Sequence, residues 1–365
     1  MLRALELARR AQGRTSPNPL VGAVLVKDGR VVGEGFHRRA GAAHAEVEAL
    51  RAAGAAARGA TAFVTLEPCA HHGRTPPCAD GLIAARVAQV YSAGEDPNPR
   101  VNGGGHAALR AAGIRVRTGL CAEQAREINL PFFKYVACGR PWVTAKFAMS
   151  LDGKLATRRG ESQWITAEAA RRRGHHLRNM TDAVLVGAGT ALADDPRLTT
   201  RLPETESDIR NPLRIVVDSS GRVPLTARMF TEELPGNAVL ATTEAAASEH
   251  CSALRERGVQ VWRLPADENG RVELGALLDE IGRREMLTLL GSELTGAFVA
   301  AGLLDEVCAF VAPLLIGGRA APGPVGDPGA GALAQALRLG NLVTEKIGAD
   351  VLIRGEVLKN DEGES

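Results

Sequence analysis

The sequence is poor in aromatic residues, which make up only 4% of its 365 residues. It also lacks an excess of one charge, because 44 basic residues stand against 42 acidic ones, interleaved along the chain, and the formal net charge is +2. A protein that binds nucleic acid concentrates Lys and Arg on one face and stacks bases on aromatic rings. The composition therefore disfavours a nucleic-acid partner.

The sequence has no stretch long and apolar enough to span a membrane, and residues 1–6 contain an acid and no secretory apolar core. We therefore expect no membrane partner and a cytoplasmic location.

Four of the six cysteines, Cys121, Cys138, Cys251 and Cys308, show no disulfide-like spacing. Such scattered cysteines are typical of reduced thiols in that compartment.

The chain is long enough for two domains, and its 45% of hydrophobic residues can build two ordinary cores. Helical and strand patterns alternate, which favours an α/β fold. Residues 138–141, Cys-Gly-Arg-Pro, interrupt this alternation, so we expect one domain over residues 1–141 and a second over 142–365. Expected strands cover residues 21–26, 31–35, 62–66, 87–92 and 114–118 in the first domain. Those of the second start at 142 and cover 183–186, 213–217, 238–241, 259–263, 286–290, 306–312 and 350–355.

Three polar residues have the spacing of a catalytic zinc site: His44, Cys69 and Cys78. One neutral imidazole and two thiolates balance the charge of Zn²⁺ and leave one tetrahedral position open for water. Glu46 lies two residues beyond the histidine, where it can move a proton between that water and a leaving amine without binding the metal. This combination predicts hydrolytic deamination of a ring amine with Glu46 as the catalytic residue.

Other interpretations of these residues stay open. A lone histidine is more often a packed or surface residue, and cysteines are often buried apolar groups. Eight residues separate Cys69 from Cys78, and within them His71 and His72 are alternative ligands. The same insert is rigid and basic, so His71, His72 and Arg74 can face an anionic group of the substrate. Residues 96–99 form either a substrate loop or an ordinary turn.

Local patterns also predict where these residues lie. Apolar residues at positions 2, 5, 7 and 8 indicate an amphipathic first helix. A helix over 43–53 begins close to His44, and strand 62–66 is expected to deliver Pro68 and Cys69 to the start of another helix. In the second domain, residues 186–190, Val-Gly-Ala-Gly-Thr, leave a strand and enter a helix, a geometry suited to a phosphate.

Two blocks of sequence resemble the bifunctional riboflavin-biosynthesis deaminase/reductase family. Residues 66–78, Leu-Glu-Pro-Cys-Ala-His-His-Gly-Arg-Thr-Pro-Pro-Cys, are similar to its zinc motif, and residues 16–24 to its substrate loop and first strand. Residues 146–154 and 162–166 match its reductase half. With residues 192–196 and 313–318 added, the resemblance covers nearly the whole chain.

The resemblance implies a cytidine-deaminase-like three-layer domain that binds Zn²⁺, followed by a dihydrofolate-reductase-like domain that binds NADPH. It implies hydrolytic deamination of a diamino-hydroxy-ribosylaminopyrimidine phosphate, and then NADPH-dependent reduction of the ribosyl group to ribityl. The partner is accordingly a small pyrimidine ribose phosphate, and we expect a homo-oligomer.

The resemblance also assigns roles to individual residues. Cofactor-binding residues are Ala148, Trp164, Thr190, Asp194 and Gly291. Substrate-binding residues are Asn18, His71 and Arg74 in the first domain, and Lys146, Ser162, Arg178, Leu198 and Arg201 in the second. The two arginines, Arg178 and Arg201, can clamp a ribose phosphate through forked hydrogen bonds. Plainer interpretations are a core aromatic for Trp164, a helix stop at Asp194 and solvated charges for the arginines.

One position departs from the family, since Leu289 stands where relatives carry a substrate-binding Glu. Glu293 lies nearby and can enter the site from another angle. The alternatives for the second domain are therefore a phosphate-binding domain that does not reduce, or a scaffold for oligomerisation. A zinc deaminase that acts on nucleic acid is the remaining alternative, and the composition disfavours it.

Overall fold

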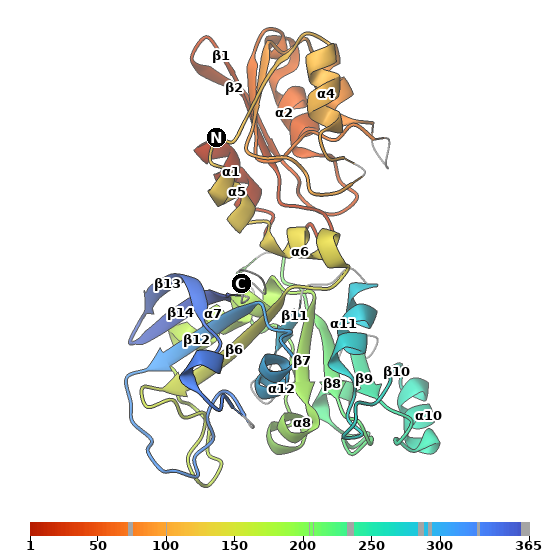
Figure 1. The fold of residues 1–365 in the computed structure, drawn as a ribbon, viewed down its shortest axis with the longest axis vertical. Helices are drawn as coiled ribbons and strands as arrows, with labels where there is room; N and C mark the ends of the chain where they lie inside the picture. Colours follow the sequence, from red (N-terminus) through yellow and green to blue (C-terminus); the bar gives the residue numbers. More distant parts are fainter. Residues whose placement is uncertain are drawn as a thin grey trace. The chain divides into compact units, whose positions relative to one another are not determined.

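The computed structural model describes residues 1–71, 76–99, 101–203, 205–206, 208–231, 237–283, 288–290, 294–326 and 329–358, with only the backbone at 288–290. The chain divides into two compact units, Met1–Gly139 and Arg140–Ser365 (Figure 1). No helix in the described ranges is long and apolar enough to cross a membrane.

The first unit is built on a five-stranded sheet with the order β2-β1-β3-β4-β5. Its strands are β1 (Gly22–Lys27), β2 (Arg30–Phe36), β3 (Thr61–Val64), β4 (Gln89–Ser92) and β5 (Arg115–Thr118). β1 pairs antiparallel with β2 and with β3, whereas β3, β4 and β5 are parallel. Asp28 and Gly29 form the two-residue turn between β1 and β2, with positive φ at both, as a type I′ hairpin requires.

Helices cover both faces of this sheet, which gives three layers. They are α1 (Leu2–Arg9), α2 (Ala45–Ala53), the 3₁₀ turn η1 (Gly54–Ala57), α3 (Cys78–Ala84), α4 (Gly104–Ala111), α5 (Ala122–Glu127) and α6 (Leu130–Cys138). Alternate residues of a strand point to opposite faces. In β1, Leu25 therefore packs in the cluster that includes α2, α3 and α4, whereas Val24 packs against α1. The predicted first helix is confirmed, although Leu2 is 64% exposed and does not belong to its buried face.

Two glycines let α2 lie unusually close to β2. A Cβ atom on Gly33 would lie 2.2 Å from the carbonyl oxygen of Ala49, and one on Gly35 would lie 2.4 Å from that of Ala45. Any side chain at these positions would push the helix away from the sheet. The close packing fixes the start of α2, where His44 is the N-cap residue.

The prediction that a helix starts at Pro68 and Cys69 is wrong. Cys69 lies in an irregular segment after β3, and α3 begins at Cys78 with Pro77 as its N-cap. The two consecutive prolines explain the difference, because the residue before a proline is kept out of the helical region. Pro77 thereby keeps Pro76 outside the helix, and Pro77 itself, with ψ of 136°, is the N-cap residue.

The second unit contains a nine-stranded sheet with the order β10-β9-β8-β7-β11-β6-β12-β14-β13. Its strands are β6 (Val143–Ser150), β7 (Ala183–Gly187), β8 (Leu213–Val217), β9 (Ala238–Thr242), β10 (Gln260–Arg263), β11 (Thr288–Leu290), β12 (Glu306–Ala312), β13 (Leu339–Ile347) and β14 (Asp350–Val357). Neighbours from β10 to β12 are parallel, whereas β14 and β13 join antiparallel. The periodicity did not predict β13, because most of its side chains are exposed and show no apolar alternation.

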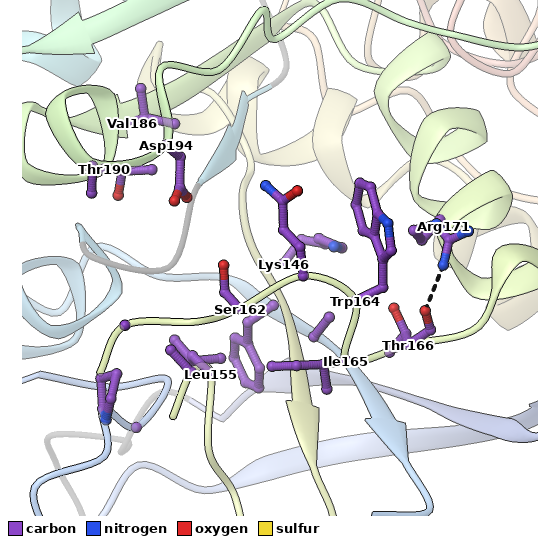
Figure 2. Close-up of a pocket in the computed structure, with 18 of the residues that line it drawn as sticks. Lys146, Leu155, Ser162, Trp164, Ile165, Thr166, Arg171, Val186, Thr190 and Asp194 are labelled. Carbon is purple, nitrogen blue, oxygen red and sulfur yellow. Dashed lines mark hydrogen bonds between the residues drawn. The ribbon is translucent and has the colours of Figure 1, made fainter. Parts of the chain in front are cut away.

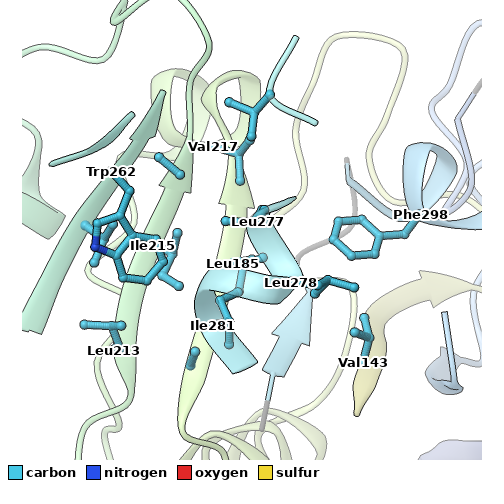
Figure 3. Packing of buried hydrophobic residues seen from close by; sticks show 14 of the residues in the cluster. Val143, Leu185, Leu213, Ile215, Val217, Trp262, Leu277, Leu278, Ile281 and Phe298 are labelled. Atoms are coloured by element: carbon cyan, nitrogen blue, oxygen red, sulfur yellow. The ribbon is translucent and has the colours of Figure 1, made fainter. Parts of the chain in front are cut away.

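Two groups of helices cover the two faces of this second sheet. The helical elements are α7 (Glu168–Asn179), α8 (Ala188–Asp194), α9 (Arg228–Thr231), α10 (Ser248–Glu256), α11 (Leu274–Gly282), α12 (Leu294–Ala300) and η3 (Leu333–Gln335). On one face, Leu185 and Ile215 pack against Leu277 and Ile281 of α11 (Figure 3). On the other face, a separate cluster contains residues of β7, β8, β9, α8 and α10.

Replacement of Gly35 by Ala is expected to loosen α2 locally. The new methyl group would overlap the backbone at Ala45, and such overpacking costs about 1–3 kcal/mol. Hydrogen-exchange mass spectrometry of peptides from α2 measures this as faster exchange. Gly94→Ala is the matched control, because a Cβ there meets no atom within 4 Å. Equal exchange of α2 in both variants would contradict the close packing.

Candidate active sites

His44, Cys69 and Cys78 come together in the first unit, and their ligand atoms all lie within 4.8 Å of one another. The Nδ1 atom of His44 is 3.2 Å from Sγ of Cys78 and 3.6 Å from Sγ of Cys69. Ligand atoms around tetrahedral zinc lie about 3.5–3.8 Å apart, given Zn–N of about 2.0 Å and Zn–S of about 2.3 Å. The donor set and its spacing therefore fit a zinc ion.

The two cysteines shift each other's pKa in opposite directions. The thiol of Cys78 donates a hydrogen bond to the sulfur of Cys69 and so lowers the pKa of Cys69. Contacts of that sulfur with His44 and with the backbone N–H of Cys78 act in the same direction. The contact between the two thiols, together with burial, raises the pKa of Cys78. The thiolate form is thus favoured at Cys69. Its sulfur lies against the first backbone N–H of α3, where the helix dipole stabilises negative charge.

Glu46 lies in the first turn of α2, beside the ligand cluster and not within it. Its side chain is buried, and burial raises its pKa to about 7, with the Cys69 charge acting in the same direction. A buried carboxyl group beside a metal can take up and release protons. Its position follows from that of His44, since both lie at the start of the same helix.

Glu67 supports this cluster, and the sequence analysis did not identify it. Its buried carboxylate accepts backbone N–H bonds of 2.9 Å from Gly103 and Gly105, and further ones from Asp96 and His106. A Cβ atom on Gly105 would lie 1.7 Å from the carbonyl oxygen of Pro68. Glu67 therefore fixes the segment that carries Cys69 against the start of α4.

The substrate residues predicted for the first unit have different surroundings. The side-chain amide of Asn18 is 3.1 Å from Nε2 of the buried His37, whose ring lies edge-on to His44 with 5.4 Å between the centroids. His37 is a further residue that the sequence analysis missed. His71 is exposed and does not join the ligand cluster of the described residues. Arg74, like the alternative ligand His72, lies outside the described residues.

The second unit contains a cavity of about 700 Å³ above β6 and β7. Its lining includes eight of the residues predicted for the cofactor and the substrate: Ala148, Trp164, Thr190, Asp194, Lys146, Ser162, Arg178 and Leu198. Figure 2 shows Thr190 and Asp194 of α8 at one side, Trp164 and Arg171 at the other, and Lys146 between them.

Trp164 is 67% exposed, so the alternative of a core aromatic is wrong. The guanidinium carbon of Arg171 lies 4.6 Å from the centroid of its ring, and Arg171 donates a hydrogen bond of 2.8 Å to the carbonyl of Thr166. This cation–π contact leaves an aromatic surface at the edge of the cavity. Asp194 is the last residue of α8 and also lines the cavity. It therefore lies at a helix end, as one interpretation predicted, and in the cavity, as the other requires.

Positive charge gathers at the Lys146 end of the cavity. Burial, together with the nearby Arg178 guanidinium, lowers the pKa of Lys146 to about 8. Burial and Arg201 lower the pKa of Arg178 to about 10. Cations that depress one another's pKa in this way form a site for an anionic group.

Four residues that the sequence analysis considered for this site are not part of the described lining. Arg201 is exposed, and its backbone N–H donates to the imidazole of His175. Gly291 and Glu293 lie outside the described residues. For Leu289 only the backbone is described, and it pairs in β11 with Thr144 of β6 and Val184 of β7. The consequence of a leucine at this position therefore stays a prediction.

Family models match both units. The model described as the RibD C-terminal domain matches residues 141–353. The model described as the cytidine and deoxycytidylate deaminase zinc-binding region matches residues 1–93, which include His44, Glu46 and Cys69.

Proteins similar to the chain over nearly its full length have one name in common. The riboflavin biosynthesis protein RibD of Escherichia coli (strain K12) is 43% identical over 97% of this chain and 97% of its own length. RibD of Aquifex aeolicus is 42% identical over 96% and 95%, respectively.

Solved structures agree with this similarity. Acinetobacter baumannii RibD (form 1) has a TM-score of 0.86 and 39% identity and covers 98% of both chains. A diaminohydroxyphosphoribosylaminopyrimidine deaminase/5-amino-6-(5-phosphoribosylamino)uracil reductase from Thermotoga maritima has a TM-score of 0.82 and 35% identity, with 98% of this chain and 97% of its own covered. The expected fold, a cytidine-deaminase-like domain followed by a dihydrofolate-reductase-like domain, is confirmed.

Removal of the Arg178 charge is expected to raise the pKa of Lys146 above its value of about 8. Only the neutral amine reacts with acetic anhydride, so the pH profile of Lys146 acetylation in Arg178→Met should move to higher pH. Peptide mapping by mass spectrometry measures the extent of Lys146 acetylation at each pH. Arg172→Met is the control, because Arg172 lies on the same helix but pairs with Glu206. If the pH profile of acetylation moves equally in both variants, the charge of Arg178 is not what lowers the pKa of Lys146.

Proposed function

The chain belongs to the RibD family of bifunctional riboflavin-biosynthesis enzymes, and we propose that each of its two units carries one of the two reactions. The proposed deaminase domain covers residues 1–141 and the proposed reductase domain covers 142–365. The support for this division is that the zinc cluster lies in Met1–Gly139 and the large cavity in Arg140–Ser365.

The first reaction is the hydrolytic deamination of 2,5-diamino-6-ribosylamino-4(3H)-pyrimidinone 5′-phosphate. His44, Cys69 and Cys78 would hold the zinc ion, which when bound supplies Lewis-acid activation of water. In the overall reaction, oxygen from water bonds to the ring carbon, the carbon–nitrogen bond breaks and ammonia leaves. The observation that supports this role best is the convergence of three ligand atoms from separate elements.

Glu46 moves the proton that this reaction requires. Its carboxyl group is held in the first turn of α2, two residues after the N-cap His44, and is shielded from bulk water by burial. It takes a proton from the attacking water and gives it to the leaving amine. Asn18, His71 and Arg74 are proposed to bind the substrate in the same domain.

The second reaction is the reduction of the ribosyl group of the aminouracil product to ribityl. We assign a nicotinamide cofactor, NADPH, to the cavity, next to Ala148, Trp164, Thr190, Asp194 and Gly291. The first four of these residues line the cavity, and Thr190 lies in the first turn of α8 after the glycine-containing end of β7. The nicotinamide, when bound, supplies the hydride.

The substrate of this reaction is proposed to bind at the positive end of the cavity. Lys146, Ser162, Arg178 and Leu198 line it, and Arg201 adds its charge close to Arg178. The guanidinium groups bind the 5′-phosphate through charge-assisted hydrogen bonds. This arrangement leaves the opened sugar carbon between the phosphate and the cofactor, in the middle of the cavity.

We also propose that the enzyme is a homo-oligomer. Strand β13 is the last strand of its sheet, and its side chains Leu342 and Val343 are 60% and 55% exposed. An apolar edge strand is a surface on which a second chain can pair. Sedimentation of the purified protein measures this directly, and a monomer at micromolar concentration would contradict it.

Glu46→Gln is expected to keep zinc but to lower the deamination rate by about 10²–10⁴-fold, the usual contribution of acid–base catalysis. Product formation is followed by mass spectrometry, and zinc content by elemental analysis. Reduction of the deaminated intermediate should proceed at the wild-type rate. Glu48→Gln on the same helix is the control, because Glu48 pairs with Arg51 at the surface. Zinc loss, or full deamination activity, in Glu46→Gln would show that the assignment is wrong.

A further inference from the structure

His175 lies on α7 one turn before Arg178, which lines the positive end of the cavity. Its Nδ1 atom accepts the backbone N–H of Arg201 at 3.2 Å, and Nη1 of Arg178 lies 3.4 Å from the same atom. A guanidinium group and a backbone amide can only donate. The lone pair of Nδ1 therefore faces both donors, and the neutral ring carries its hydrogen on Nε2.

The surroundings keep this imidazole neutral. Burial, together with the charges of Arg178, Arg201, Lys146 and His176, lowers the pKa of His175 to about 4. A carboxylate at this position would also hold the arginines, but it would cancel the charge that an anionic ligand needs. A neutral histidine orients the donors and leaves their positive charge intact.

Arg178 has the same kind of neutral support at a second point. Its Nη1 atom donates a hydrogen bond of 2.7 Å to the carbonyl oxygen of Thr199. Both protein acceptors thus lie at Nη1, whereas Nε is buried without a hydrogen-bond partner in the part of the chain that is described. A guanidinium group fixed at one nitrogen presents its remaining donors in a defined direction.

We propose that His175 is a positioning residue for the phosphate group of the substrate. Through Nδ1 it holds Arg178 and the backbone at Arg201 in the orientation that binds the phosphate, without neutralising either arginine. This inference rests on the proposed function, which places the ribosyl phosphate at these two residues. It adds a residue to that site and explains why a histidine, and not an acid, stands among the cations.

The test compares His175→Ala and His175→Asn with wild type. The side-chain oxygen of Asn lies the same number of bonds from Cα as Nδ1 of His, so this variant keeps an acceptor in place. His176→Ala is the matched control, because His176 is the next residue of the helix and lies 3.5 Å from Glu206. Reduction is measured with the phosphorylated aminouracil substrate and with its dephosphorylated form, and ribose 5-phosphate is titrated by calorimetry without cofactor.

In His175→Ala, KM for the phosphorylated substrate and Kd for ribose 5-phosphate should each rise roughly tenfold, the scale of one lost hydrogen bond to a charged group. The turnover number, KM for the dephosphorylated substrate and NADPH affinity should stay within about twofold of wild type. His175→Asn should recover most of the loss, and His176→Ala should behave like wild type.

Equal losses with both substrates would mean that His175 is merely structural and would overturn the inference, as would unchanged binding in His175→Ala. If His175→Ala does not fold, His175→Gln replaces it, because its acceptor lies one bond further out. The inference would then be overturned if the Gln and Asn variants showed the same ratio of KM for the dephosphorylated substrate to KM for the phosphorylated one. A wild type that does not distinguish the two substrates would overturn the phosphate site itself, together with this inference.

Discussion

Both proposed active sites hold titratable side chains away from water, and much of the surrounding structure follows from this constraint. A buried charge is costly unless hydrogen bonds or an opposite charge stabilise it. Burial accordingly raises the pKa of Glu46 and lowers that of Lys146, so that both groups can change protonation state near neutral pH. Each shift moves the group towards its neutral form, which is the direction that desolvation dictates.

The two units stabilise their buried polar groups in different ways. The deaminase unit uses the starts of helices, since His44 caps α2 and Cys78 begins α3. The reductase unit uses neutral acceptors, because the carbonyl of Thr199 and the ring of His175 hold Arg178 without removing its charge. The difference suits the proposed ligands, since Zn²⁺ binds thiolates well and a phosphate group binds cationic side chains.

Local patterns were sufficient to predict that His44, Cys69 and Cys78 cluster and where the buried strands lie. His44 and Glu46 are two residues apart, and strands such as β7 and β8 are short apolar runs whose burial the sequence directly encodes. The start of α3 was placed incorrectly, because the two prolines before Cys78 delay it. β13 was missed, since an exposed strand carries no apolar alternation.

The residues that sequence reasoning missed depend on distant partners. Glu67 binds backbone groups 29 to 39 positions away, and the role of His175 depends on Arg201, 26 positions away. No local periodicity records such contacts, because they form only when the sheet and its loops are in place. The sequence nevertheless contained two signals. One is an acid directly before Pro68 and Cys69, and the other is a histidine one turn before Arg178.

The central claim is that one chain deaminates a pyrimidine and then reduces its ribosyl group. Mass spectrometry of the product formed from the diaminopyrimidine substrate, with and without NADPH, tests it most directly. Without NADPH the product should be about 1 Da heavier, because an amine is replaced by oxygen. With NADPH a further gain of about 2 Da should follow, as a hydride and a proton are added. Absence of the first product would contradict the deaminase site, and absence of the second gain would contradict the reductase site.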